Sequence, residues 1–102
     1  MVQSIRKRDG NLQTFHPEKI TWAIFKAARA CGGDDFELAA ELSDQVVALI
    51  ESTFEGRIPD VEEVQDLVER VLIKHGHAKT AKAYILYREK RTGARNMNAL
   101  IG

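Results

Sequence analysis

Residues 5–20, IRKRDGNLQTFHPEKI, constrain the fold most, because this stretch holds a cationic strand, a turn, a second strand and a helix start. Asp9 and Gly10 indicate the turn. A two-residue hairpin connection needs positive φ at its centre, which glycine adopts freely and aspartate tolerates. We therefore predict that the chain reverses over residues 8–11 and forms a β-hairpin.

Four amphipathic helices are predicted after this hairpin, from apolar residues that recur at spacings of three and four. Pro17 and Glu18 favour a first helical turn, so the first helix begins at His16 or Pro17. The first helix ends at about Ala30, and the second runs from a cap at Asp34 or Asp35 to about Thr53. The third begins with a capping box of Asp60 and Glu63 and ends at Gly76. The fourth runs from about Ala78 to Arg91. The predicted fold class is α+β, with a short N-terminal hairpin covering a four-helix bundle.

Composition is that of one small soluble domain. Of the 102 residues, 44% are hydrophobic and 29% are charged. No apolar run reaches the roughly 20 residues of a membrane span, and the beginning lacks the apolar core of a secretory signal. The single cysteine, Cys31, excludes an intrachain disulfide and a cysteine-rich zinc site within this chain. We expect a cytoplasmic location.

Charge is unevenly distributed although the net charge is zero. Residues 34–69 contain twelve acidic residues and one basic residue, a net of −11, and the remainder holds fourteen basic and three acidic residues, a net of +11. We expect these two regions to lie on different faces. If the chain ends come together, their cations could form one positive region suited to polyphosphate or nucleic acid. Those cations are Arg6, Lys7, Arg8 and Lys19 near the start and Lys82, Arg88, Lys90 and Arg91 near the end.

Catalytic motifs are not evident in the sequence. It contains no P-loop, no G-x-G-x-x-G after a strand, no paired-cysteine metal spacing and no nucleophile with an adjacent base. His75 and His77 flank a glycine, and two histidines without a further ligand favour capping over metal binding. Binding remains, either of a small polyanion by the hairpin cations or of a macromolecular partner by the helices. Direct nucleic-acid binding is disfavoured because neither a recognition helix nor an aromatic strand platform is evident.

Motifs along most of the chain resemble the ATP-cone, a small nucleotide-binding regulatory domain found at the N-terminus of many ribonucleotide reductases. The similarity runs through IRKRDG, FHPEKI, AIFKAAR, the Glu-Gly-x-Ile-Pro connection, VEEVQDLVERVL, a GH break and AKAYILYREKR. The resemblance places an ATP-cone over residues 1–93. Residues 94–102 lack a sustained pattern and are expected to be a linker or an extension toward a following domain. The stretch KAARACGGDD looks closest to the cones of anaerobic or cobalamin-dependent reductases.

The resemblance implies an allosteric domain that binds ATP or dATP, with Mg²⁺, and controls an attached ribonucleotide reductase through its oligomeric state. The cations among the implied binding residues contact or enclose the phosphates, and His16 and Ile20 lie near the base or sugar. The implied nucleotide-binding residues are Lys7, Arg8, Gln13, His16, Lys19, Ile20, Gln65, Arg88 and Lys90. Implied partners are adenine nucleotides, the catalytic domain of the reductase and further copies docked through helical faces. The domain itself would carry neither catalytic residues nor a catalytic cofactor, and its parent would be a ribonucleoside-triphosphate reductase.

Three alternatives stay open: a stand-alone nucleotide sensor, a degenerate cone that acts only as a docking module, and part of a transcriptional repressor of reductase genes. The repressor is disfavoured, because a related family places the cone after a zinc ribbon whose cysteine pairs this chain lacks. Replacing Lys7 and Lys19 with alanine separates the other two, since a sensor loses nucleotide affinity and a docking module keeps its partner.

Overall fold

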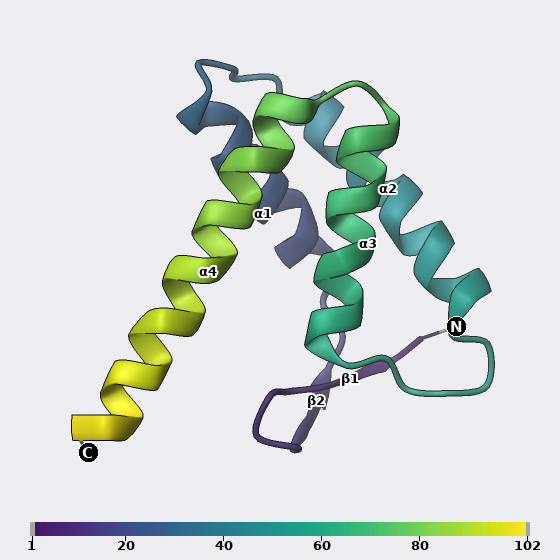
Figure 1. Ribbon diagram of the computed structural model, residues 1–102. Coiled ribbons are helices and arrows are strands. Elements are labelled where there is room, and N and C mark those ends of the chain that lie inside the picture. The colour runs from purple at the N-terminus through teal and green to yellow at the C-terminus, as the bar shows by residue number, and fades with distance from the viewer. Residues whose placement is uncertain (1, 102) are drawn as a thin grey trace.

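The computed structural model describes the backbone of residues 2–101 and the side chains of residues 2–90. A two-stranded hairpin precedes four helices along the chain (Figure 1). The elements are β1 (Ser4–Arg6), β2 (Leu12–Thr14), α1 (Pro17–Ala30), α2 (Phe36–Thr53), α3 (Val61–Lys74) and α4 (Ala78–Ile101). The predicted α+β fold, a short hairpin on a four-helix bundle, is confirmed.

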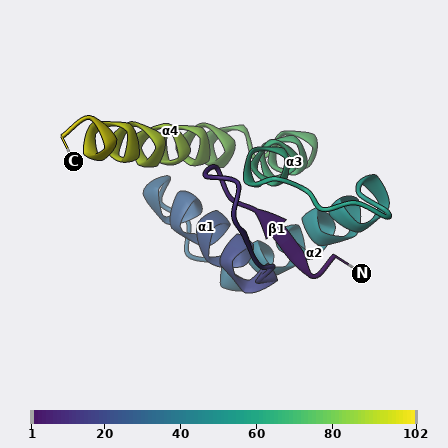
Figure 2. The ribbon, with the colours of Figure 1, turned by 90° about the horizontal axis from the view of Figure 1, so that it is seen from below.

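The four helices form a closed ring around one hydrophobic core. Helix α1 packs against α2 and α4, and α3 packs against the same two helices. The hairpin lies across one end of this ring (Figure 2). Each helix turns its apolar stripe inward, which is the arrangement that removes most apolar surface from water. The most deeply buried side chains include Ile24, Val46, Ile50, Val68 and Leu72.

Strand β1 is anchored to the bundle through both a side chain and the backbone. The side chain of Ile5 joins the core and is 7% exposed. The Arg6 N–H donates to the carbonyl oxygen of Pro59 at 2.9 Å, and Arg6 forms a parallel bridge with Asp60. Because Pro59 and Asp60 lead directly into α3, these contacts fix the hairpin beside the first turn of α3.

The hairpin turn contains three residues, so the predicted two-residue turn was wrong. The Lys7 N–H donates to the Asn11 carbonyl at 2.8 Å, which leaves Arg8, Asp9 and Gly10 in the loop. Within the hairpin only Gly10 has positive φ, at 90°. Asp9 instead accepts a hydrogen bond from the Asn11 N–H at 2.9 Å, the Asx turn that aspartate forms without a left-handed backbone. Asp-Gly therefore suits a three-residue loop, with glycine at the left-handed position, as well as a two-residue one.

The first three helices begin at the residues that their predicted start signals indicate. Pro17 is the first residue of α1. The Asp35 carboxylate accepts a hydrogen bond from the Leu38 N–H at 3.0 Å at the start of α2. At α3, Asp60 accepts from the Glu63 N–H at 2.8 Å and Glu63 accepts from the Asp60 N–H at 3.2 Å, which completes the capping box.

Helix α4 continues to Ile101, ten residues beyond the predicted end at Arg91. The prediction treated the lack of an amphipathic pattern after Gly93 as a stop. One glycine inside a helix costs only about 1 kcal/mol, and the alanines and leucine that follow it favour helix. The assignment of residues 94–102 as a linker or extension toward another domain stays a prediction.

Candidate functional site

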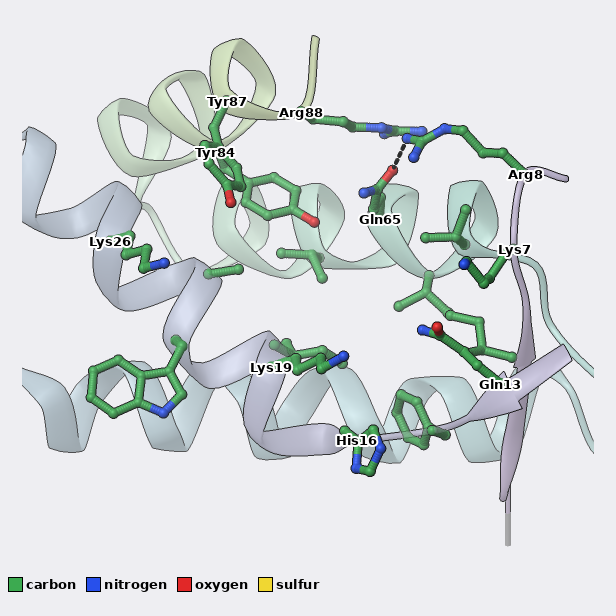
Figure 3. A pocket seen from close by; sticks show the side chains of 18 residues that line it. Lys7, Arg8, Gln13, His16, Lys19, Lys26, Gln65, Tyr84, Tyr87 and Arg88 are labelled. Atoms are coloured by element: carbon green, nitrogen blue, oxygen red, sulfur yellow. Dashed lines mark hydrogen bonds between the residues drawn. The ribbon is translucent and has the colours of Figure 1, made fainter. Parts of the chain in front are cut away.

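A pocket of about 470 Å³ lies where the hairpin, α1, α3 and α4 meet (Figure 3). The hairpin supplies cations and a glutamine, α1 supplies cations and apolar side chains, and α3 and α4 supply the opposite wall. Eight predicted binding residues line it, namely Lys7, Arg8, Gln13, His16, Lys19, Ile20, Gln65 and Arg88. Lys90, the ninth, does not line this pocket.

Three lysines face the pocket from the hairpin and from α1. Lys7 belongs to the hairpin, and Lys19 and Lys26 lie on α1 seven residues apart, which places them on the same side of the helix (Figure 3). Over the part of the chain whose side chains are described, none of the three takes part in an ion pair. Their positive charge is therefore available to an anion that enters the pocket.

The two arginines of the pocket are held differently, by acceptors on α3. Arg8 Nε donates to Glu62 Oε1 at 2.7 Å, and its Nη2 donates to Gln65 Oε1 at 3.1 Å. Arg88 donates to the other oxygen of the same Glu62 carboxylate. Glu62 thus bridges an arginine of the hairpin and an arginine of α4 (Figure 3 shows both guanidinium groups reaching toward one region from opposite sides).

Arg88 is bound by further carboxylates of the same helix. Its Nη1 donates to Asp66 Oδ1 at 2.9 Å and to Glu69 Oε1 at 2.8 Å. Burial works against the charged form, yet hydrogen bonds to Glu62, Glu69 and Asp66 raise the pKa of Arg88 above its usual range. The hydrogen bond from Arg88, with help from Arg8, lowers the pKa of Glu62. Both partners are therefore charged at neutral pH.

These contacts correct the expectation that acidic and basic regions lie on different faces. The acidic segment includes α3, and its carboxylates pair directly with Arg8 of the hairpin and Arg88 of α4. The two ends of the chain do come together, as Arg8 and Arg88 show by sharing Glu62. Linear charge segregation failed as a guide to faces because adjacent helices of a bundle bring distant segments into ion-pair distance.

An apolar wall closes the pocket on the side of the core. It is formed by Ile5, Ile20, Val64, Val68 and the ring of Tyr84. Tyr84 is only 5% exposed, and burial raises the pKa of its hydroxyl well above the usual range, so the hydroxyl keeps its proton. Tyr87 adds a second ring from the next turn of α4. A flat, apolar ligand group with polar edges fits this mixture of aliphatic surface and tyrosine.

Ten lining residues were not among the predicted site residues, namely Ile5, Phe15, Trp22, Ala23, Lys26, Val61, Val64, Val68, Tyr84 and Tyr87. Helical spacing could have found Lys26, which lies two turns after Lys19 on the same face. The same spacing could have found Tyr84, which lies one helical turn before Arg88, and Tyr87 is the residue next to Arg88. Trp22 is 52% exposed at the rim, where its ring packs against Phe25 and Phe36 at centroid distances of 5.9 and 5.0 Å.

His16 and Gln13 lie at the open side of the pocket. His16 is the residue before α1 and makes no side-chain cap, but its Nδ1 lies 3.2 Å from Glu18 Oε1. Gln13 is on β2, opposite Ile5 in the strand register. Both residues are exposed, in contrast to the buried residues of the apolar wall.

Other chemistry-bearing residues lie outside this pocket. Cys31 is exposed, and its thiol donates to the Lys79 carbonyl at 3.3 Å. Among the residues the structure describes, no three histidine, cysteine or acidic side chains are placed to bind a metal ion. In the same part of the chain, no helix is long and apolar enough to cross a membrane.

Comparison with known proteins identifies the family of this chain. The sequence pattern of the ATP cone domain matches residues 3–93. A vitamin B12-dependent ribonucleoside-diphosphate reductase of Thermoplasma acidophilum is 41% identical over the whole chain. The ribonucleoside-diphosphate reductase subunit alpha of Chlamydia muridarum is 42% identical over 91% of the chain, and the anaerobic ribonucleoside-triphosphate reductase of Escherichia coli is 36% identical over 89%. The chain spans only 14%, 10% and 12% of these three relatives. The match over residues 3–93 shows that the chain belongs to the ATP cone domain family.

Proposed function

We propose that this domain binds ATP and dATP in the pocket between the hairpin, α1, α3 and α4, and that binding regulates a ribonucleotide reductase to which the domain is attached. The observation that carries the proposal is that one pocket of about 470 Å³ combines an apolar, tyrosine-containing wall with lysines that have no ion-pair partner among the described side chains. A nucleoside triphosphate needs both features, cations for its phosphates and apolar surface for its base. Membership of the ATP cone domain family supports the choice of adenine nucleotides.

The two ends of the nucleotide are assigned to different parts of the pocket. Lys7 and Lys19 hold the phosphates, since their amino groups face the pocket without a carboxylate partner among the described side chains (Figure 3). The adenine lies toward Ile20 and Tyr84, where the wall is apolar. Mg²⁺ enters with the triphosphate, because phosphate oxygens are among its usual ligands and the described lining of the pocket contains no carboxylate.

Calorimetric titration of the 102-residue chain with ATP, dATP and GTP in the presence of magnesium tests this function. We expect saturable binding of ATP and dATP and much weaker binding of GTP, because the chain belongs to the ATP cone domain family. Absence of heat with all three nucleotides, on a sample that circular dichroism shows to be helical, would leave a docking module as the better account.

We propose further that the output is a change of assembly in the parent protein. The relatives are reductases, and the chain covers only a small share of each, so the domain would act on a neighbouring catalytic region. A ligand regulates a protein only if it binds one of two states more tightly than the other, and we propose that these states are two arrangements of subunits. Light scattering on the full-length reductase should show a larger assembly, and lower activity, with dATP than with ATP. Equal mass and activity with both nucleotides would refute this output.

A further inference from the structure

Glu62 lies between two cations at the edge of the pocket, although it is not one of the residues that line it. Its two oxygens are divided between them, Oε1 to Arg8 and Oε2 to Arg88. Arg88 keeps two other carboxylates, those of Asp66 and Glu69. Among the described side chains, Arg8 has only Glu62 as an anionic partner, and Gln65 adds a neutral acceptor oxygen. Loss of Glu62 would therefore leave Arg8, and not Arg88, without a counter-charge.

The Glu62 carboxylate occupies a place on Arg8 that a phosphate of a bound ligand could take. Arg8 lines the same pocket as Lys7 and Lys19, and a carboxylate and a phosphate present similar oxygen pairs to a guanidinium group. The Glu62 side chain is 47% exposed and that of Arg8 is 24% exposed, so the contact can open into solvent without unpacking the core. An exposed pair of this kind is weak enough for a triphosphate to replace.

We propose that Glu62 competes with the triphosphate of the nucleotide for Arg8, so that the strength of the Glu62–Arg8 pair sets the affinity of the pocket. This inference rests on the proposed nucleotide-binding function. Glu62 sets this affinity through Arg8, and Gln65 keeps the guanidinium group near the pocket while the carboxylate is displaced.

The substitution Glu62→Gln tests the competition, because it removes the charge and keeps the size. Calorimetry with ATP and with inorganic tripolyphosphate should show tighter binding of both probes by a similar factor, up to roughly fivefold for an exposed ion pair. The matched control is Glu63→Gln on the next residue. It removes the same charge, lies away from Arg8, and keeps the capping box because glutamine serves there as well as glutamate.

The double variant Arg8→Gln/Glu62→Gln isolates the pair. Without Arg8 the carboxylate has no ligand contact to block, so Glu62→Gln should then leave the affinity for tripolyphosphate unchanged relative to Arg8→Gln alone. If Glu63→Gln raises the affinity as much as Glu62→Gln does, the cause is the net charge of the protein. If Glu62→Gln binds the nucleotide more weakly than the parent chain, Glu62 serves to orient Arg8. Either result overturns the inference. If the parent chain binds neither ATP nor dATP, the proposed function itself fails, which is a different outcome from unchanged affinity in the variant.

Discussion

The lysines and the arginines of the pocket differ in their ion-pair partners. Lys7, Lys19 and Lys26 face it without ion-pair partners among the described side chains, whereas Arg8 and Arg88 are tied to α3. A flexible lysine can follow a phosphate, and a planar guanidinium group is held well by paired oxygens. The arginines therefore organise the edge of the pocket, and the lysines carry most of the charge offered to a ligand.

Replacement of Lys19 by alanine should weaken ATP binding about tenfold or more, the usual cost of losing one hydrogen bond between charged groups. Calorimetry on the folded variant measures the change. Lys74→Ala is the matched control, since Lys74 lies at the end of α3 and does not line the pocket. Equal loss in both variants would point to net charge rather than to a specific contact.

Stability should depend on acid pH through Glu62. The hydrogen bond from Arg88 lowers the folded-state pKa of Glu62 below the unfolded value of 4.5. A group with a depressed folded pKa stabilises the protein above its unfolded pKa, and this contribution disappears as the pH falls through the folded pKa. The free energy of unfolding of the parent chain should therefore exceed that of Glu62→Gln by more at pH 7 than at pH 3. Parallel curves for the two proteins from urea denaturation would contradict this.

At the scale of elements, the connection between α2 and α3 does more than join two helices. Its last residues pair with β1 through the bond from Arg6 to Pro59, and Asp60 then caps α3. The first turn of α3 carries Glu62, so the cap also fixes the carboxylate that holds Arg8. Hairpin and α3 are thus positioned by the same few residues.

Loss of this cap should be measurable as stability. Asp60→Ala should lower the free energy of unfolding by about 1 kcal/mol, because the Glu63 N–H loses its acceptor at the start of α3. Chemical denaturation monitored by circular dichroism measures the difference. Asp34→Ala removes a carboxylate just before α2, where Asp35 and not Asp34 is the cap, and should change stability by less than about 0.5 kcal/mol. A similar loss in both variants would argue against the cap as the cause.

At the scale of the whole molecule, the pocket is lined by residues that lie far apart in the sequence. Its lining residues run from Ile5 to Arg88, so most of the domain must be assembled before the site exists. One core stabilises all four walls, since each helix packs against two others. Loss of core packing should therefore reduce binding and stability together.

Two adjacent residues of α3 test this dependence. Leu72 is fully buried and Ile73 is 58% exposed. Leu72→Ala should lower the free energy of unfolding by about 2 to 5 kcal/mol, the range for a buried leucine that leaves a cavity. Ile73→Ala should lower it by less than about 1 kcal/mol, because most of its side chain is already in water. Comparable thermal midpoints for the two variants would show that Leu72 does not belong to a common core.

The sequence by itself determined the local structure of this protein and the chemistry of its cations. Caps, glycines and apolar spacing act over a few residues, so Pro17, Asp60 and the helices of the bundle could be predicted from them. The length of the hairpin loop and the end of α4 were predicted wrongly, because Asp-Gly suits two turns and a single glycine does not stop a helix. Only the tertiary structure decided that Arg8 and Arg88 share Glu62 and that Lys26 and Tyr84 face the same pocket as Lys7. These contacts join the hairpin to residues of separate helices, and their geometry depends on how the ring of helices closes rather than on any local pattern.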